Sequence, residues 1–206
     1  SVAVAAEWPH WRGPTHNGTA EAEGLAAEFG EARNVRWRVE LPGLGEGTPV
    51  CANGRIYLPA YRNGDLLGVC LDHATGEVLW TAELGKGERD RKERLVSCSP
   101  VTNGDNAWFA FSNGDIVCVD ADGQEQWRLN LRERYGAFKM LFTYSASPLL
   151  VGDRLYIGMM VISGTDYVLC LDAKTGETLW RTIRHTEAKG ETQDSYASPV
   201  PLDLDG

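Results

Sequence analysis

The sequence predicts an all-β fold, a β-propeller of four-stranded antiparallel blades that form part of a ring. One phrase, a hydrophobic pair followed by Asp, a turn and Trp, occurs three times at steps of 48 and 52 residues. A second phrase, a small residue followed by Pro and an apolar residue, occurs four times at steps of 51, 48 and 51 residues. Turn residues divide each repeat into four short strands, which is the pattern of a propeller blade.

The first repeat shows the order of the predicted elements. Its strands and turns are a strand from 50, the hairpin dipeptide Asn53-Gly54, a strand at 55–60, a turn at Asn63-Gly64, a strand at 66–72, a turn at 74–76 and a strand at 78–84. The other two repeats place turn residues at matching positions, and no segment has a helical period of useful length. A β-sandwich of hairpins would use similar turns, but it would not explain why Asp-turn-Trp returns at every fourth strand.

The two phrases also set the domain boundaries. The predicted parts are a signal-peptide remnant and N-terminal extension at 1–33, a lone closing strand at 34–41, complete blades at 45–84, 96–131 and 143–183, and the start of a further blade at 196–206. Propellers close with about four to eight blades. We therefore expect the natural chain to continue for about 150 to 250 residues, with strand 34–41 sealing the ring against C-terminal strands.

Composition limits the partners and the compartment. The net charge of −9 argues against nucleic acid or an anionic membrane as the main partner. No apolar run approaches the roughly 18 to 20 residues that span a bilayer. The small apolar start at 1–6 is similar to the end of a secretory signal with cleavage after Ala5 or Ala6, which favours export to the periplasm, the cell surface or the medium.

The five cysteines fall into two groups. Cys70, Cys118 and Cys170 each stand two residues before the repeated Asp, and we expect them to be small buried hydrophobic residues. Cys51 and Cys98 lie near Pro49 and Pro100 at different offsets, which leaves a disulfide between them open.

The first phrase matches the tryptophan-docking motif of the quinoprotein-like propellers, which carry the pyrroloquinoline-quinone repeat. The repeats at 70–80 and 170–180 fit this motif with Cys in the Ala place, whereas the second repeat is one residue shorter and needs a tighter turn. An indole buries a large apolar area and keeps one N–H that needs a carbonyl, so Trp suits contacts between blades. The predicted docking residues are Asp72, Thr75, Gly76, Trp80, Asp120, Gly123, Trp127, Asp172, Thr175, Gly176 and Trp180.

The N-terminal stretch at 7–14, Glu-Trp-Pro-His-Trp-Arg-Gly-Pro, resembles the opening of exported bacterial propellers related to the outer-membrane-assembly lipoprotein type. This resemblance implies an exported, non-catalytic scaffold that binds a protein or a small ligand on the face of the ring. The alternative is the N-terminal part of a quinone-dependent alcohol or sugar dehydrogenase, which would hold pyrroloquinoline quinone and calcium. No residue matches the metal ligands or catalytic Asp of that class, no adjacent cysteine pair is present, and no cofactor is evident.

Two further sets of residues are candidates for contacts. The loops after each fourth strand should gather on one face, and Arg134, Tyr135, Phe138 and Lys139 mix aromatic and basic side chains in one of them, which makes this the best candidate contact loop. His10 and His16 are six residues apart; a metal site is one interpretation, and solvated histidines are the favoured one.

Overall fold

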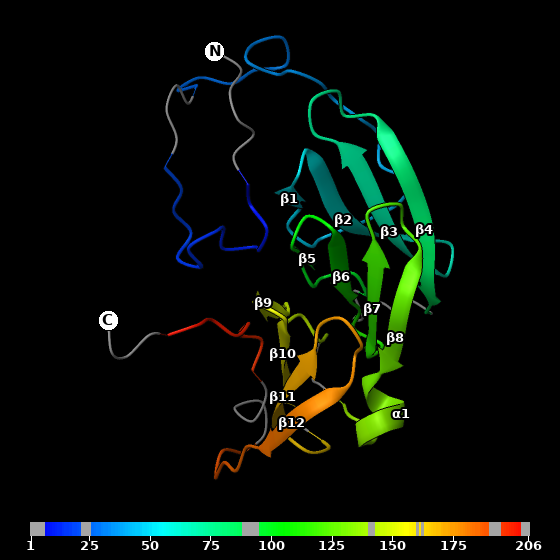
Figure 1. Ribbon diagram of the computed structural model, residues 1–206, viewed down its shortest axis with the longest axis vertical. Coiled ribbons are helices and arrows are strands. Elements are labelled where there is room, and N and C mark those ends of the chain that lie inside the picture. Colours follow the sequence, from blue (N-terminus) through cyan, green and yellow to red (C-terminus); the bar gives the residue numbers. More distant parts are fainter. Residues whose placement is uncertain are drawn as a thin grey trace.

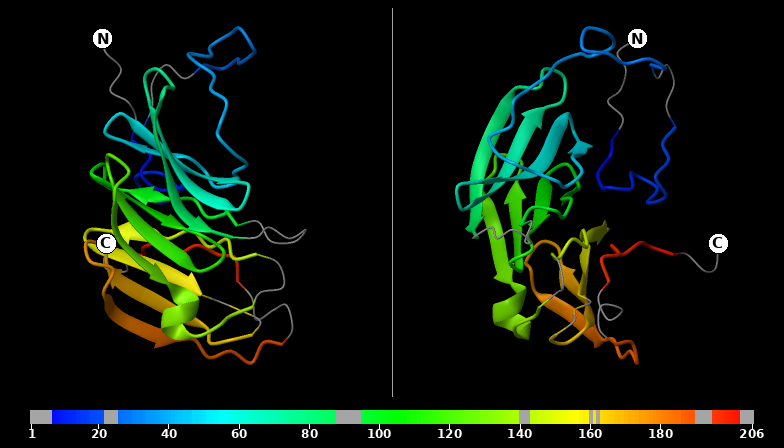
Figure 2. Two further views of the ribbon diagram at one scale, coloured as in Figure 1. Left: turned by 90° about the vertical axis from the view of Figure 1, so that its right-hand side faces the viewer. Right: turned by 180° about the vertical axis from the view of Figure 1, so that it is seen from behind.

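The computed structural model describes residues 7–21, 26–87, 95–139, 143–159, 161, 163–189 and 195–202. The signal-like start at 1–6, most of the charged loop at 85–94 and the end of the chain at 203–206 lie outside the described residues. Three four-stranded antiparallel sheets stand side by side like the segments of a fan, as Figures 1 and 2 show. The all-β partial propeller is therefore confirmed.

Each blade is an up-and-down meander whose strands pair in chain order. Blade 1 contains β1 (Val50–Ala52), β2 (Arg55–Arg62), β3 (Asp65–Asp72) and β4 (Val78–Lys86). Blade 2 contains β5 (Val101–Thr102), β6 (Asn106–Ala110), β7 (Asp115–Asp120) and β8 (Glu125–Asn130). Blade 3 contains β9 (Leu149–Val151), β10 (Arg154–Met159), β11 (Tyr167–Asp172) and β12 (Thr178–Ile183).

The turns follow from their residues. Asn53 and Gly54 both have positive φ, 49° and 72°, as a tight two-residue hairpin turn requires. In every blade, the register between the third and fourth strands shifts directly after the repeated Cys, just before the Asp turn. Such a bulge bends the strand and increases its twist, which helps direct the following turn towards the neighbouring blade.

The apolar cores lie between the blades. One cluster joins the facing sides of blades 1 and 2, with Tyr57 and Phe109 among its buried residues. A second joins blades 2 and 3, with Trp108 and Ile157. A third covers the other face of blade 1, where Trp37 packs from the N-terminal segment. Each sheet is thus stabilised mainly by its neighbours.

Three parts of the chain lie outside the strand ladders of the blades. Residues 34–41 form no ladder with any described residue, and their pairing with a later strand stays a prediction. The described part of 196–206 also forms no ladder. A short helix, α1 (Leu131–Tyr135), was not expected; Asn130 caps it by accepting hydrogen bonds from the N–H groups of Arg132 and Glu133.

Candidate functional site

The repeated Asp organises the turn that the next tryptophan contacts. Asp72 Oδ1 accepts hydrogen bonds from the backbone N–H groups of Ala74 (2.9 Å) and Thr75 (2.8 Å) and from the Thr75 hydroxyl (2.9 Å). Asp172 accepts the corresponding bonds from Lys174 and Thr175. The bond from the Thr75 N–H in particular lowers the pKa of Asp72, and that from Thr175 lowers the pKa of Asp172, because each stabilises the carboxylate.

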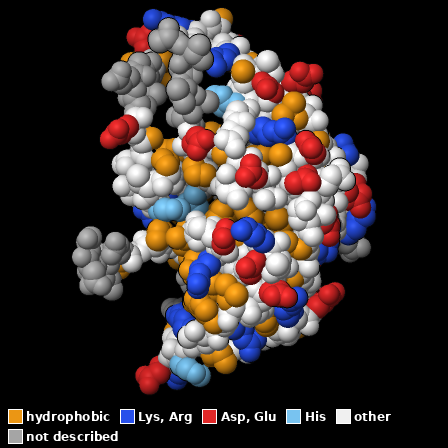
Figure 3. Space-filling view, viewed as in Figure 1, with side chains coloured by type: hydrophobic (Ala, Val, Ile, Leu, Met, Phe, Trp, Pro, Cys, Tyr) orange, Lys and Arg blue, Asp and Glu red, His pale blue; other side chains and the backbone are white. Residues whose placement is uncertain are grey.

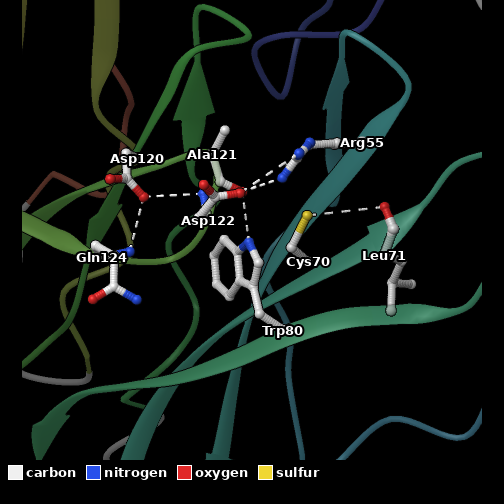
Figure 4. Close-up of polar contacts among 8 residues, drawn as sticks. All are labelled: Arg55, Cys70, Leu71, Trp80, Asp120, Ala121, Asp122 and Gln124. Atoms are coloured by element: carbon white, nitrogen blue, oxygen red, sulfur yellow. Dashed lines mark hydrogen bonds and ion pairs between the residues drawn. The ribbon is translucent and has the colours of Figure 1, made fainter.

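The shorter second repeat makes the tighter turn that its length predicts. Gly123 N–H donates to the Asp120 carbonyl three residues back, whereas Gly76 N–H reaches four residues back to Asp72. Asp120 Oδ1 accepts from the N–H groups of Asp122 and Gln124, both at 2.9 Å, as Figure 4 shows. Asp120 thus has two backbone donors, as Asp72 does, and in place of a Thr hydroxyl it accepts a side-chain bond from Gln126 Nε2 to its other oxygen, Oδ2, at 2.8 Å.

Each docked indole donates to the carbonyl that follows the Asp of the next turn. Trp80 Nε1 donates to Ala121 O at 2.8 Å, from blade 1 to blade 2 (Figure 4). Trp127 Nε1 donates to Ala173 O at 2.9 Å, from blade 2 to blade 3. Trp37 Nε1 donates to His73 O at 3.0 Å, so the N-terminal segment places a tryptophan where a preceding blade would.

The Gly of each turn is required by both its backbone and its neighbour. Gly76, Gly123 and Gly176 have φ of 76°, 80° and 70°. A Cβ on these glycines would lie 2.5, 2.8 and 2.6 Å from the rings of Trp37, Trp80 and Trp127, in that order. No side chain fits between turn and indole, so each of these three turns requires glycine.

The repeated cysteines lie in the middle of a cross-strand row of aromatic side chains. In blade 1, Cys70 is paired in register with Tyr57 on one side and Trp80 on the other. Cys118 and Cys170 occupy the same place in their blades. All three are buried, and burial raises the pKa of Cys70 to about 11 and that of Cys118 to about 12, which keeps these thiols protonated. Cys51 and Cys98 are not joined by a disulfide, which answers the question that the sequence left open.

Trp180 is the exception among the motif tryptophans. It is 39% exposed, contacts the Tyr156 ring at 6.0 Å between centroids, and makes no hydrogen bond to a described residue. The face of blade 3 that carries Trp180 corresponds to the faces of the other two blades on which Trp80 and Trp127 are partly buried.

The second sequence phrase forms a separate ladder that sequence reasoning missed. The Thr48 N–H donates to Ser99 Oγ (2.8 Å), the Ser99 N–H to Ser147 Oγ (2.9 Å), and the Ser147 N–H to Ser198 Oγ (2.8 Å). The shared period of the small residue before Pro was the available signal. We refer to these three bonds as the Ser–Pro ladder.

The four residues predicted as a contact loop meet at the boundary of blades 2 and 3. Arg134 Nη1 donates to Gly176 O at 3.0 Å, and the Tyr135 hydroxyl bonds Thr178 Oγ1. Phe138 packs 6.4 Å from the Tyr144 ring, and Lys139 exchanges two backbone hydrogen bonds with Ser163. The loop is held against blade 3 while Arg134 and Lys139 stay exposed, and its role in binding stays a prediction.

The N-terminal segment crosses the inner strands. Trp8 exchanges two backbone hydrogen bonds with Cys51, the middle residue of β1, at 2.8 and 2.9 Å. The next residue, Pro9, accepts from the Thr102 N–H of β5 at 3.0 Å. In Figure 1 this dark-blue segment lies on the side of β1, away from β4 and β8. It connects two blades at their inner strands, opposite the docked tryptophans.

The histidines of this segment are not the solvated pair that the sequence favoured. His10 is only 2% exposed, and its ring centroid lies 4.8 Å from that of His16. Burial is the main cause that lowers the pKa of His10 to about 4, followed by the His16 and Arg12 charges, and burial also lowers the pKa of His16. Within the described part of the chain, no three His, Cys, Asp or Glu side chains converge on a metal position. No helix among the described residues is long and apolar enough to cross a membrane.

Comparisons with known proteins agree with this geometry. A family model described as outer membrane protein assembly factor BamB matches residues 20–183. The quinohemoprotein alcohol dehydrogenase of Comamonas testosteroni is 24% identical with a TM-score of 0.53, and the match covers 68% of this chain and 21% of that one. The quinohemoprotein alcohol dehydrogenase ADHIIG of Pseudomonas putida HK5 is 20% identical with a TM-score of 0.52, covering 71% and 22%.

A further solved structure is BamB from Moraxella catarrhalis, 15% identical with a TM-score of 0.45, covering 71% of this chain and 54% of that one. No curated protein matches the chain. The chain spans about a fifth of the length of the two dehydrogenases, and at these identities the likeness is one of fold.

Proposed function

Since the chain belongs to the family of the outer membrane protein assembly factor BamB, we propose that it is an exported, non-catalytic propeller that binds a protein partner. The observation that carries this proposal is the contact loop at 134–139. It is fastened to blade 3 by the bond from Arg134 Nη1 to Gly176 O and by the backbone bonds of Lys139, yet both residues remain exposed. A surface that is already ordered loses less conformational entropy on binding, and the mix of Arg and aromatic side chains is typical of binding hot spots.

The motif residues support the same proposal because their polar atoms are used inside the protein. Asp72 and Asp172 hold turns, and Trp80 and Trp127 hold neighbouring blades. Recognition of another molecule therefore falls to the loops beyond the strand ends. On the side seen in Figure 3, charged groups of both signs lie among exposed apolar side chains, a surface suited to a protein partner.

Site-specific crosslinking in the native host tests this function. A photo-reactive amino acid replaces Lys139 in one variant and Glu77, an exposed residue at the opposite end of the strands, in the matched control. We expect a discrete protein adduct from position 139 and none from position 77. Equal adducts from both positions, or none from position 139, would remove the support for a binding face at the contact loop.

Two further measurements bear on the remaining parts of the proposal. Cell fractionation with mass spectrometry of the mature N-terminus should find exported protein that begins after Ala5 or Ala6.

Adding pyrroloquinoline quinone and calcium to the protein should give neither dye-linked alcohol oxidation nor a bound-cofactor absorbance. Appearance of both would replace the scaffold proposal by a quinone-dependent dehydrogenase.

A further inference from the structure

The N-terminal segment folds into a tight loop that gathers four nitrogen-bearing side chains. The Gly13 N–H donates to His10 O at 2.7 Å, and the Gly18 N–H donates to Arg12 O at 2.8 Å. The loop brings the Trp11 ring to 6.0 Å from His10 and the Arg12 guanidinium carbon to 5.5 Å from the Trp11 ring centroid. His16 closes the group against His10. We refer to His10, Trp11, Arg12 and His16 as the N-terminal donor cluster.

Three nitrogens of this cluster are buried without a hydrogen-bond partner in the described residues. They are His10 Nε2, Trp11 Nε1 and His16 Nδ1. An indole nitrogen is a donor only. His10 Nδ1 accepts the Arg12 backbone N–H at 3.2 Å, so the proton of the neutral ring is on Nε2, which is therefore a second donor. The Pro148 carbonyl lies close enough to raise the pKa of His10 but not in a geometry that satisfies Nε2.

The charge of the cluster is also unbalanced. The Arg12 guanidinium makes no ion pair with any carboxylate in the described part of the chain, although the protein carries 29 acidic residues against 20 lysines and arginines. Buried donors left without an acceptor are costly, and so is a partly buried cation without a counter-charge. A cation ligand would add to this imbalance, because Arg12 repels it and His10 Nε2 carries a proton.

We propose that the N-terminal donor cluster binds a small oxyanion, a carboxylate or a phosphate group. Such a group offers several acceptor oxygens and one negative charge or more. The Arg12 guanidinium matches its planar fork of oxygens, and Trp11 Nε1 and His10 Nε2 supply neutral donors from the same cluster. His10 and His16 are neutral near pH 7, so Arg12 supplies the charge.

The site is independent of the contact loop, because its residues lie on the N-terminal segment next to β1 and β5. It is also independent of the Asp turns and the docked tryptophans. Ordered water is the competing occupant, since water can also accept from buried donors. Water would give no saturable binding of an anion, and this difference defines the test.

Equilibrium dialysis of the full chain at constant ionic strength in chloride tests the proposal with labelled inorganic phosphate and, separately, labelled succinate. We expect saturable binding of at least one of them with one ion per chain. Arg12→Gln should weaken binding at least about tenfold, because a charge-assisted bidentate pair is lost. Arg12→Lys should retain part of the affinity, and Arg62→Gln, an exposed arginine at the end of β2, should retain all of it.

Trp11→Phe provides a second variant that keeps the ring and removes one donor, and it should weaken binding about three- to tenfold. Circular dichroism checks that each variant keeps the strand content of the parent. Binding of phosphate alone or of succinate alone identifies which oxyanion the site prefers. Absence of saturable binding, or equal weakening by Arg12→Gln and Arg62→Gln, would contradict the proposal.

Discussion

Each docked tryptophan couples a large apolar contact to one directional hydrogen bond. The ring of Trp127 lies on Gly176, and its N–H reaches Ala173 O. Trp108 Nε1 donates to the same carbonyl at 2.9 Å. The accepting carbonyl is fixed in place by the turn that Asp172 organises, so one residue joins the packing and the polar contacts of two blades.

The comparison of Trp127 with Trp180 isolates the docking bond. Trp127→Phe keeps an aromatic ring but removes the N–H, and we expect it to lower the free energy of unfolding by about 1 to 2 kcal/mol. Trp180→Phe removes an N–H that has no partner in the described structure, so its effect should stay below about 0.5 kcal/mol. Urea unfolding measures both. Equal losses would mean that the bond to Ala173 contributes nothing.

His10 predicts an acid sensitivity below neutral pH. Its pKa is lowered from 6.5 in the unfolded chain to about 4 in the folded protein, so the unfolded chain binds more protons between these values. The contribution of His10 to stability is full above pH 6.5 and is lost as the pH falls towards 4. We expect the free energy of unfolding to be lower at pH 4.5 than at pH 7. His10→Gln should reduce that difference. An unchanged difference in His10→Gln would assign the acid sensitivity to other groups.

At the scale of elements, the Ser–Pro ladder and the docked tryptophans hold each blade at two separate places. The ladder joins neighbouring blades just before their inner strands β1, β5 and β9. The tryptophans join them at the turns before β4, β8 and β12. Two separated contacts fix the angle between neighbouring blades better than either contact alone.

Ser147→Ala tests the ladder. The variant leaves the Ser99 N–H buried without an acceptor, which should cost about 1 to 2 kcal/mol of unfolding free energy. Hydrogen exchange of the Ser99 amide should become faster. Ser147→Thr keeps the hydroxyl, as Thr48 does at the equivalent position, and should remain close to the parent in both measurements. Faster exchange in both variants would indicate a steric cause.

The sequence predicts the strands and turns well because their determinants are local. Asn53-Gly54 and the Asp-x-x-Thr-Gly turns set strand ends through their own backbone preferences. The sequence does not predict α1, since five residues are too short for a helical period. It also misses the burial of His10 and the acceptor role of Ser99, because both depend on where a distant segment lies.

For the whole molecule, stability depends on contacts between neighbours in a row. Blade 2 is covered on both faces, whereas blade 3 exposes Leu179 (47%), Trp180 (39%) and Ile183 (44%) on its outer strand. In Figure 2 the third blade forms one end of the fan. An exposed apolar edge of this kind promotes association.

We therefore expect the 206-residue chain to associate at micromolar concentration or to fold poorly. Light scattering coupled to size-exclusion chromatography should show oligomers that decrease in the double variant Leu179→Lys and Trp180→Glu. The matched control Val78→Lys, on the exposed part of β4, should leave association unchanged. A monomer with a cooperative thermal transition would contradict this prediction.

The docking geometry has a consequence for how such a molecule can grow in evolution. Blade 2 carries both parts of the contact. Its Trp127 donates a hydrogen bond to blade 3, and its Ala121 carbonyl accepts one from Trp80 of blade 1. A tandem duplication of one repeat of about 50 residues would therefore create a junction whose two halves already match. Blade number could change by copying a gene segment, without any new pair of complementary residues having to arise.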